Sequence, residues 1–371
     1  MRILMICRHF PPAVSGGSRR PYLLAKSLLG LGCDVAVIAP QELEDVPTFV
    51  VPHPHIDPDH GASGAPVAPG NGLRPLLRKW TLLPDPDIRW ALRAARAAIP
   101  WRPDWVLSTS PPESSHVAGW LLKRKYRCRW VADFRDSWFE EPLRPERQGS
   151  TVRRNIERFL ARRLMPAIDA TIAVSDFVGD EVAGLCPGVP AATIGYFAEA
   201  PAKATDLPGG EVHVVHTGSF ALSDPRRRIE PVLEAFEAAA NPKLRLHLVG
   251  RLSTDEIGRV HLSSLIDQIT VTGAVPRETA RSYQGAADVL LLVAVPDSQR
   301  VPGKIAEYQS AGRPVLAVGG GAWLDAFGLD RVDDLAAAFA ALPDAMPPPA
   351  KPAQTPDSAA RHLVEFLSRQ P

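Results

Sequence analysis

Basic residues stand at two places in the second half of the chain where helices are expected to begin. The stretch from Arg300 to Pro314 reads RVPGKIAEYQSAGRP and lies between two short apolar runs, 288–295 and 314–318. This pattern predicts a buried strand, a loop, a short helix and a second buried strand. Pro302 suits the first helical position, and Gly303 leaves room for a ligand near the unpaired amides of the first turn.

Lys304 lies in that expected first turn. A cation there opposes the helix dipole, which costs about 0.3–1 kcal/mol unless an anion is also bound. A phosphate group would satisfy both the lysine and the free amides. Glu307 follows on the same helical face, where a carboxylate can accept both hydroxyls of a ribose. An ordinary surface pair between Lys304 and Glu307 is an equally good interpretation of the spacing.

A second group of cations occupies positions 226–228. It follows an expected strand over 212–217, the turn Gly218-Ser219, and Asp224-Pro225, which predicts the start of a helix that runs to about Ala239. Three arginines in its first turn would again oppose the dipole, and they indicate an anion, most simply a diphosphate. Three arginines exposed to solvent remain the alternative.

In the first half, charged residues follow the expected strand 129–133. Asp133, Arg135 and Asp136 lie at its carboxyl end, where burial costs free energy unless the charges pair or meet a polar ligand. An internal pair between Arg135 and one of the aspartates is one interpretation, and a polar ligand is the other. His116 lies near the start of the next expected helix, as a general base or as a structural hydrogen-bonding group.

The pair Gly16-Gly17 falls between an expected first strand, 3–7, and an expected helix, 21–31. Glycine allows the backbone to approach a ligand closely at such a point. The pair lacks the G-x-G-x-x-G spacing, and no acidic residue ends the second strand, 33–39. A dinucleotide site of the usual kind is therefore not expected.

Composition narrows the class of protein. The 371 residues suffice for two domains, and 42 basic against 41 acidic residues argue against a general nucleic-acid binder. Four cysteines and scattered histidines form no metal-binding pattern, which predicts no metal and a reduced, cytoplasmic setting. The first residues lack a signal peptide's apolar run, and no segment is long enough to span a membrane, so any membrane contact is expected to be peripheral.

Alternating strands and helices occur in two series, which predicts an α/β fold. The expected division is an N-terminal Rossmann-like domain over 1–197, a linker over 198–210, a C-terminal Rossmann-like domain over 211–350, and a proline-rich segment with a last helix over 351–371. This last part is expected to pack back on the first domain. The basic and aromatic stretch from Leu73 to Ile99 could lie on an anionic membrane, line an acceptor groove, or form a solvated helical face. A basic amphipathic helix is expected over 152–164.

Several motifs together resemble a known family. VPGKIAEYQSAGRP (301–314) resembles the donor loop of retaining family 4 glycosyltransferases, and VADFRDSW (131–138) is similar to a sequence of their bacterial polysaccharide branch. The pattern Ser108 to His116, Gly16-Gly17, His216 to Ser219 and Val271 to Val275 fit the same group. The resemblance implies a GT-B fold, in which two doubly wound Rossmann-like domains face a cleft.

The resemblance also implies residue roles. Glu307 would hold the ribose of a nucleotide, and the backbone of Val275 would meet the base. Lys304, Arg227 and His116 would be the catalytic groups nearest the transferred sugar and its diphosphate. The remaining residues implied in donor binding are Gly16, Gly17, Gly218, Ser219, Arg226, Arg228, Arg251, Gln299 and Gly303, and those implied in shaping the cleft are Asp133, Arg135 and Asp136.

One position departs from the family pattern. The family commonly has a second glutamate eight positions before Glu307, and this chain has Gln299 there, which leaves the contacts to the sugar open. The expected activity is retaining, metal-independent transfer of a sugar from a nucleotide diphosphate to a glycan or lipid-linked acceptor, with no cofactor. The alternatives are a nucleotide-sugar epimerase on the same fold and a non-catalytic subunit. Sequence does not choose among UDP, GDP and dTDP, and it leaves the sugar, acceptor and oligomeric state open.

Overall fold

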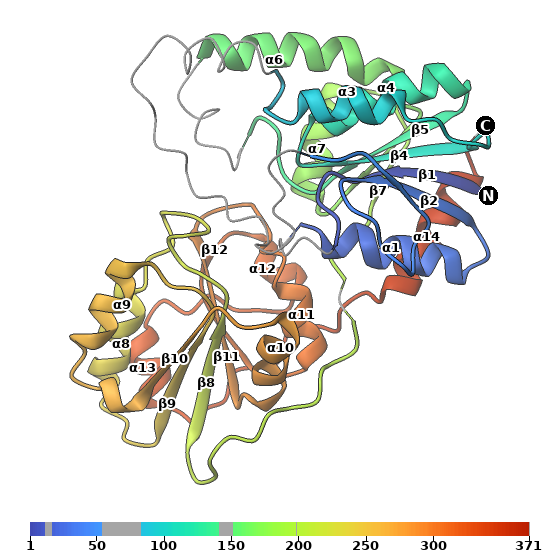
Figure 1. The fold of residues 1–371 in the computed structure, drawn as a ribbon. Coiled ribbons are helices and arrows are strands. Elements are labelled where there is room, and N and C mark those ends of the chain that lie inside the picture. Colours follow the sequence, from blue (N-terminus) through green and yellow to red (C-terminus); the bar gives the residue numbers. More distant parts are fainter. Residues whose placement is uncertain (12–16, 54–82, 141–150, 198, 371) are drawn as a thin grey trace. The chain divides into compact units, whose positions relative to one another are not determined.

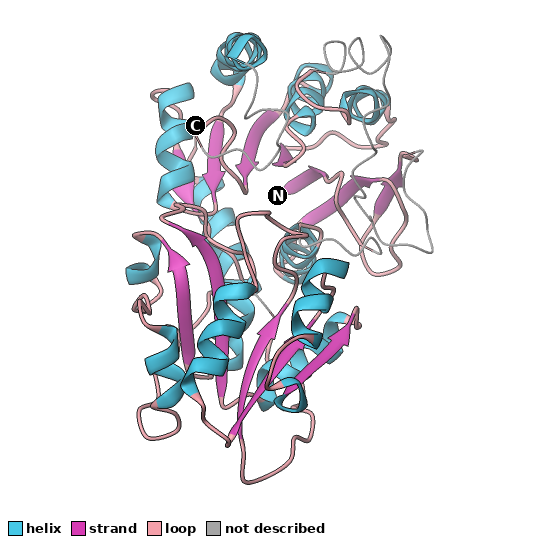
Figure 2. Ribbon diagram, turned by 90° about the vertical axis from the view of Figure 1, so that its left-hand side faces the viewer, coloured by secondary structure: helices cyan, strands magenta, loops and turns pink. Residues whose placement is uncertain are grey.

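A computed structural model describes residues 1–11, 17–53, 83–140, 151–197 and 199–370. The chain forms two compact units, one of Met1–Tyr196 with Thr355–Pro371 (unit 1) and one of Phe197–Gln354 (unit 2). Each unit is a parallel sheet with helices on both faces (Figures 1 and 2). Within the described residues, no helix has the length and apolar character needed to cross a membrane.

The sheet of unit 1 has the strand order β3-β2-β1-β4-β5-β6-β7. All its pairings are parallel, and the chain reverses direction across the sheet between β1 and β4, which is the point where ligands bind in such sheets. Both faces of the central strands are buried, so these strands read as continuous apolar runs. The strands are β1 (Arg2–Ile6), β2 (Asp34–Ala39), β3 (Thr48–Val50), β4 (Trp105–Ser110), β5 (Arg129–Phe134), β6 (Ala170–Ala173) and β7 (Ala191–Thr193).

Helices of unit 1 cover both faces of this sheet. Helices α1 and α14 pack together on one face, and α3 and α4 pack together on the other (Figure 1). Ser175 caps α7, because its hydroxyl accepts a hydrogen bond from the amide of Val178 at 3.4 Å. The helices are α1 (Arg19–Gly30), α3 (Ile88–Arg96), α4 (Ser114–Tyr126), α6 (Thr151–Leu164), a 3₁₀ turn (Met165–Ala167), α7 (Asp176–Leu185) and α14 (Pro356–Ser368).

Unit 2 has the strand order β10-β9-β8-β11-β12, again with all pairings parallel. Phe236 and Phe339 meet edge to face at 5.9 Å and join α8 to α13 on one face of the sheet. The strands are β8 (Val212–Thr217), β9 (Leu244–Val249), β10 (Ile269–Gly273), β11 (Val289–Pro296) and β12 (Val315–Gly320). The helices are α8 (Glu230–Ala239), α9 (Thr254–His261), a 3₁₀ turn (Ile266–Gln268), α10 (Arg277–Ala286), α11 (Ile305–Ala311), α12 (Trp323–Ala326) and α13 (Leu335–Ala340).

Two helix starts differ from the sequence prediction. The helix expected from Asp224-Pro225 begins at Glu230, so the arginines 226–228 lie in the preceding turn and not in the first turn of α8. Asp224 closes that turn by accepting the amide of Arg226 at 3.0 Å. Lys304 is likewise the N-cap of α11, one residue before Ile305, and not a first-turn residue. The dipole argument for these cations was therefore wrong in detail, and contacts between side chains have to explain them.

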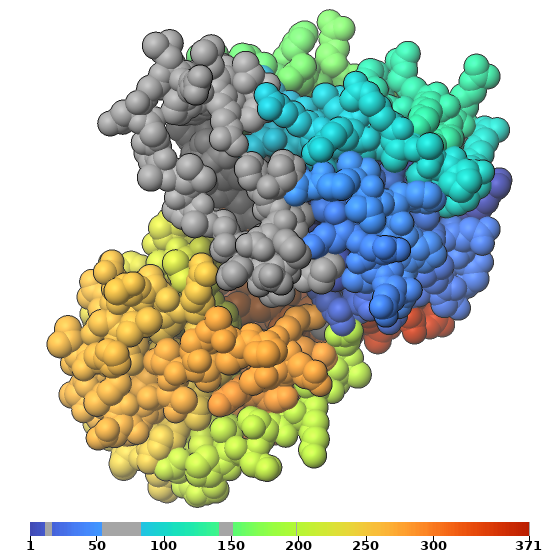
Figure 3. Space-filling view, in the orientation of Figure 1, coloured from blue at the N-terminus to red at the C-terminus, as the bar shows by residue number. Residues whose placement is uncertain are grey.

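Unit 1 incorporates the end of the chain through α14. Ala359, Ala360, Leu363 and Leu367 are fully buried, and the Ser27 hydroxyl on α1 donates to Asp357 Oδ1 at 2.6 Å. The space-filling view shows the red surface of this helix directly against the blue surface of the first helix (Figure 3). Residues far apart in sequence thus share one core.

Replacing Leu363 by alanine is expected to lower the free energy of unfolding of unit 1 by about 2–5 kcal/mol, because a large buried side chain leaves a cavity. Guanidinium unfolding followed by tryptophan fluorescence measures this, since Trp323 is the single tryptophan beyond residue 197. His362→Ala, at an exposed position of the same helix, is the matched control. Equal stability of the two variants would contradict the packing of α14.

Candidate functional site

Lys304 is the centre of a cationic cluster at the carboxyl end of the sheet in unit 2. Its ammonium donates to the carbonyl of Thr217, the last residue of β8, at 2.5 Å. Burial, with repulsion from Arg227, lowers the pKa of Lys304 from 10.5 to about 7, against an opposing effect of Glu307. At pH 7 this lysine is therefore only partly charged, because the folded protein disfavours its charged form.

Two glycines make room for this lysine. Gly218 has φ +98°, and a Cβ there would lie 3.2 Å from the Lys304 Nζ atom. Gly250, at the end of β9, has φ +140°, and its Cβ would lie 2.8 Å from the Gly218 carbonyl oxygen. Any larger residue at either position would be strained and would push against the cluster.

Arg227 and Arg300 complete the cluster. Burial, followed by repulsion from Arg300, lowers the pKa of the Arg227 guanidinium. The Nε atoms of both arginines are buried and have no hydrogen-bond partner among the described residues. Arg300 makes one contact with a carboxylate, Nη2 to Asp224 Oδ2 at 3.3 Å. Cations crowded together with unused donors are suited to bind an anion.

The other two arginines of the turn are directed to carboxylates. Arg226 makes a two-pronged contact with Asp224 at 3.0 and 2.8 Å, and this partner lowers the pKa of Asp224 to about 2. Arg228 contacts Glu230 at 3.2 Å, with 64% of its side chain exposed. Of the three arginines, Arg227 is thus the one that the structure brings to Lys304.

Glu307 is held in place by two residues of α10. Its Oε1 accepts hydrogen bonds from Arg277 Nε at 3.1 Å and Nη2 at 2.5 Å, and its Oε2 accepts one from Gln284 at 3.0 Å. Gln284 also donates to the Thr217 hydroxyl at 2.9 Å, so it links Glu307 to the end of β8. The carboxylate is fixed and 21% exposed, and it keeps capacity to accept further hydroxyl donors.

Tyr308 connects α11 to strands β8 and β11 of the sheet. Its buried hydroxyl accepts from the amide of Thr217 at 3.1 Å and donates to the carbonyl of Leu291 at 3.3 Å. Burial raises the pKa of Tyr308 to about 12. Lys304, Glu307 and Tyr308 therefore share one face of α11, as predicted, but that face meets the sheet and α10 and is not an ordinary surface.

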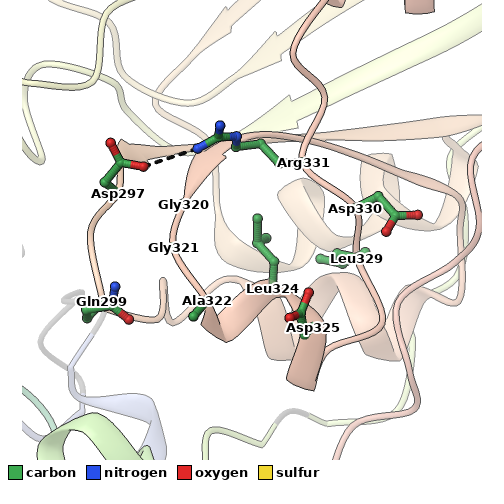
Figure 4. Close-up of a pocket in the computed structure, with 10 residues that line it drawn as sticks. All are labelled: Asp297, Gln299, Gly320, Gly321, Ala322, Leu324, Asp325, Leu329, Asp330 and Arg331. Atoms are coloured by element: carbon green, nitrogen blue, oxygen red, sulfur yellow. Dashed lines mark hydrogen bonds and ion pairs between the residues drawn. The ribbon is translucent and has the colours of Figure 1, made fainter.

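Gln299 and Asp297 line a cavity of about 310 Å³ at the ends of β11 and β12 (Figure 4). Asp297 has φ +55° and its Oδ1 contacts Arg331 at 3.1 Å across the mouth of this cavity. Gln299 lies on its opposite wall, beside Gly321 and Ala322. Gln299 thus borders an open cavity next to the cluster.

The remaining residues implied in donor binding have diverse surroundings. Gly303 and Arg251 are exposed, and Val275 is half-buried between β10 and α10. The Ser219 hydroxyl contacts that of Ser223 at 2.5 Å. Gly16 lies outside the described residues.

In unit 1, Asp133 pairs with Arg20 and not with Arg135. Arg20 Nη1 donates to Asp133 Oδ2 at 2.6 Å, both side chains are almost fully buried, and the Thr109 hydroxyl donates to the same oxygen at 2.8 Å. The interpretation that pairs Asp133 with Arg135 was therefore wrong. Arg20 comes from α1, just after the glycine pair, and it reaches across the switch point of the sheet.

Arg135 instead binds backbone carbonyls. Its guanidinium donates to Gly17, to Ser110 at 2.9 Å and to Pro111 at 2.6 Å. One side chain thus fixes two loops at the carboxyl ends of β1 and β4. Asp136, the third charged residue of the motif, is half-buried beside them.

His116 is fully buried at the start of α4. Its Nδ1 lies 2.8 Å from the Ser108 hydroxyl, which also accepts a hydrogen bond from Trp130, and its ring packs 4.5 Å from that of Phe134. Burial lowers the pKa of His116 from 6.5 to about 4, so the ring is neutral near pH 7. This arrangement favours the proton on Nε2, an atom without a hydrogen-bond partner among the described residues.

The basic and aromatic stretch is described only from Leu83 onward. Within α3, Trp90 is buried and donates to the carbonyl of Val51 at 2.8 Å, while Arg89 and Arg93 are exposed. This part agrees with a solvated helical face packed by its tryptophan. In the parts of the chain that the structure describes, no group of three histidine, cysteine or acidic residues is arranged to hold a metal ion.

Comparison with known families assigns the chain to a class. The model of the glycosyl transferase 4-like domain matches residues 15–197, and the model of glycosyl transferases group 1 matches residues 211–342. The protein is therefore a GT-B glycosyltransferase, and it resembles family 4. Membership of an enzyme family argues against the alternative that this chain is a non-catalytic subunit. A search of curated protein sequences finds no match.

Solved structures share the fold at low sequence identity. Sucrose-phosphate synthase from Thermosynechococcus elongatus matches with a TM-score of 0.60 at 16% identity, over 100% of this chain and 90% of that chain. Anabaena HepE in complex with UDP and glucose matches with a TM-score of 0.58 at 15% identity, over 100% and 95%. A putative UDP-N-acetylglucosamine 2-epimerase from Listeria monocytogenes matches at 0.55 and 14% identity, over 99% and 95%. Fold alone therefore does not separate transfer from epimerisation.

Sequence reasoning did not assign roles to Arg300, Gln284, Arg277 or Arg20. Arg300 stands at the start of the donor-loop motif, so its charge was a visible signal. The other three are recognised only from their contacts, because their partners lie between 23 and 113 positions away in the sequence.

Replacing Arg227 by glutamine is expected to weaken the binding of inorganic pyrophosphate by roughly 1.5–3 kcal/mol, the contribution of hydrogen bonds to charged groups. Arg228→Gln, an identical change at the solvent-directed neighbour, is expected to cost less than about 0.5 kcal/mol. Calorimetric titration measures both. Because Arg227 repels Lys304, its removal should leave the unliganded protein at least as stable as wild type in thermal unfolding. Equal pyrophosphate affinity of the two variants would contradict the cluster.

Proposed function

We propose that this glycosyltransferase moves a sugar from a nucleotide diphosphate to a glycan or lipid-linked acceptor. The observation that carries the proposal is the cluster of Lys304, Arg227 and Arg300, in which, besides burial, Arg227 lowers the pKa of Lys304 and Arg300 lowers the pKa of Arg227. A ligand with two adjacent negative phosphates turns this repulsion into attraction. The complex of HepE with UDP and glucose offers a precedent for such a ligand on the same fold.

The cluster also supplies the chemistry of the transfer. As the bond between the anomeric carbon and the diphosphate oxygen breaks, negative charge develops on the leaving diphosphate. Fixed cations that meet this charge lower the barrier without reorganising. Lys304, Arg227 and Arg300 take that role in the proposal, so no divalent metal and no cofactor is required. Water exclusion around the reacting sugar would limit hydrolysis.

The nucleoside part of the donor is assigned to the residues around Glu307. Its carboxylate, fixed by Arg277 and Gln284, would accept the ribose hydroxyls. The backbone near Val275 would meet the base. Gly218, Ser219 and Gly303 would let the diphosphate approach the ends of β8 and β11.

Retention of the anomeric configuration is proposed to need no protein base. The leaving phosphate can accept the proton of the acceptor hydroxyl on the same face of the sugar. His116, neutral because its pKa is about 4 and fully buried, would then not act as a general base. Gly16 and Gly17 would allow the backbone to approach a sugar closely.

The epimerase alternative has less support. It needs a carboxylate that exchanges protons with the substrate, and Asp133 and Asp136 are the candidates. Asp133 is instead bound by Arg20 and by the Thr109 hydroxyl, with 1% of its side chain exposed. A carboxylate that is buried in an ion pair in this way does not face a substrate.

Incubation with radiolabelled UDP-, GDP- and dTDP-sugars, with and without mixed glycan and lipid-linked acceptors, tests the proposal. Transfer of label to an acceptor in the presence of EDTA, with the anomeric configuration of the donor kept in the product by NMR, is the expected result. Isomerised donor would establish an epimerase. Loss of transfer in EDTA, restored by a divalent cation, would refute the metal-independent mechanism.

Affinity for the nucleotide sugar is expected to fall as pH rises above 7. Free Lys304 has a pKa of about 7, and the bound diphosphate favours its charged form, so binding takes up a proton above that pH. The affinity should therefore drop about tenfold per pH unit between the pKa of Lys304 in the free protein and its higher pKa in the complex. Calorimetry between about pH 6 and 8.5, in buffers of different ionisation enthalpy, measures the proton uptake.

Lys304→Arg is the matched control for this pH dependence, because arginine stays charged. The diphosphate of a nucleotide sugar is esterified at both ends, so it does not itself titrate in this range. An affinity for wild type that stays constant over the range would refute the assignment of Lys304.

A further inference from the structure

Helix α6 (Thr151–Leu164) turns apolar side chains to the solvent. Val152, Ile156, Phe159 and Leu160 are 60, 37, 57 and 42% exposed. Their spacing puts them on one side of the helix, where they form a continuous stripe. We call this stripe with its adjacent arginines the outer face of α6. The helix lies along the margin of unit 1 and its side chains project from the surface (Figures 1 and 3).

The side of α6 that packs on unit 1 is polar. Arg153 and Glu157 form an ion pair at 2.8 Å with 4 and 0% of their side chains exposed, and Arg153 also donates to the carbonyl of Pro84 at 3.1 Å. Ala161 is the third residue buried on this side. An ordinary surface helix buries its apolar stripe and exposes its charges, so α6 has the reverse orientation.

The outer face also carries positive charge. The helix contains five arginines and one glutamate, and Arg153 is neutralised internally by Glu157. Of the other four, Arg154 and Arg158 are half-buried, and Arg158 Nη2 contacts Glu140 at 3.7 Å, whereas Arg162 and Arg163 are exposed beside the apolar stripe. The guanidinium of Arg163 lies 5.2 Å from the centre of the Phe159 ring, so charge and apolar surface are directly adjacent.

Helix α3 shows that positive charge alone does not produce this face. Its arginines Arg89 and Arg93 are exposed, but its large aromatic residue, Trp90, is only 1% exposed. The helix thus follows the usual orientation. It exposes one large apolar residue, Leu92, at 36%, whereas α6 exposes four.

We propose that the outer face of α6 docks on an anionic lipid bilayer. The helix would lie in the plane of the membrane, with Val152, Ile156 and Phe159 inserted at the boundary of headgroups and acyl chains and the arginines bound to anionic headgroups. Charge complementarity selects this occupant, because a second copy of the same face would bring like charges together. The inference rests on the proposed function, since it places the enzyme where a lipid-linked acceptor is found.

Vesicle sedimentation tests the docking without donor or acceptor, so its failure is separate from a failure of sugar transfer. Wild type is expected to bind vesicles of phosphatidylcholine with phosphatidylglycerol and to bind pure phosphatidylcholine weakly. Ile156→Ser with Phe159→Ser should reduce the partition coefficient tenfold or more, the order expected for two lost apolar anchors. Arg162→Gln with Arg163→Gln should reduce it about fivefold per arginine, with less effect at high salt.

Matched controls come from other exposed positions. Leu222→Ser with Leu262→Ser removes two exposed leucines of unit 2, and Arg89→Gln with Arg93→Gln removes two exposed arginines of α3. Both should bind vesicles as wild type does. The α6 variants change exposed side chains, so their circular dichroism and melting temperature should match wild type.

Two results would overturn the proposal. One is unchanged vesicle binding by the α6 variants, or loss of binding by the α3 control alone. The other is a change in oligomeric state caused by the apolar α6 substitutions in sedimentation equilibrium without lipid, which would assign the outer face to contact between copies of the chain.

Discussion

Repulsion among half-buried cations is the constraint on which the arrangement of the loops in unit 2 depends. Lys304 reaches the carbonyl of Thr217 only because Gly218 and Gly250 leave space, and Arg227 then lies close enough to lower its pKa. Such an arrangement costs free energy in the unliganded protein. Folding stability does not explain it, whereas the proposed binding of a diphosphate would. The turn before α8 and the loop before α11 are therefore best understood as the two sides of an anion site.

The fold class could be predicted because parallel strands buried on both faces leave continuous apolar runs in the sequence. The first residues of the helices were harder to predict, because more than one residue could begin the same helix. Pro225 and Pro231 both suit a first helical turn, and Asp224 can either cap a helix or bind an arginine. In the structure Asp224 binds Arg226, and the helix begins after Ile229, with Pro231 in its first turn. The general location of the cations was visible in sequence, but their orientation was not.

The partners of charged residues could not be predicted for a related reason. Periodicity reports which face of an element is buried, and it contains no information on which distant residue meets that face. A pair between Asp133 and Arg135 was one interpretation of the sequence, yet Asp133 pairs with Arg20, which lies 113 positions away. Arg135 is then available to bind the carbonyls of Gly17, Ser110 and Pro111. Similarly, Glu307 was identified from its motif, but its supports on α10 come only from the packing of two helices.

Helix α6 illustrates the same limit and leads to a physical conclusion. The sequence predicts a basic amphipathic helix but does not fix which side faces inward. Burying the ion pair of Arg153 and Glu157 gains little stability, because desolvation offsets most of the attraction between the charges. Leaving Phe159 and Val152 in water forgoes the hydrophobic contribution that the opposite orientation would supply. In water, this orientation of α6 is unfavourable both for the ion pair and for the exposed apolar side chains. It becomes favourable when the apolar stripe enters the hydrocarbon of a bilayer. Anionic headgroups would then also neutralise the arginines.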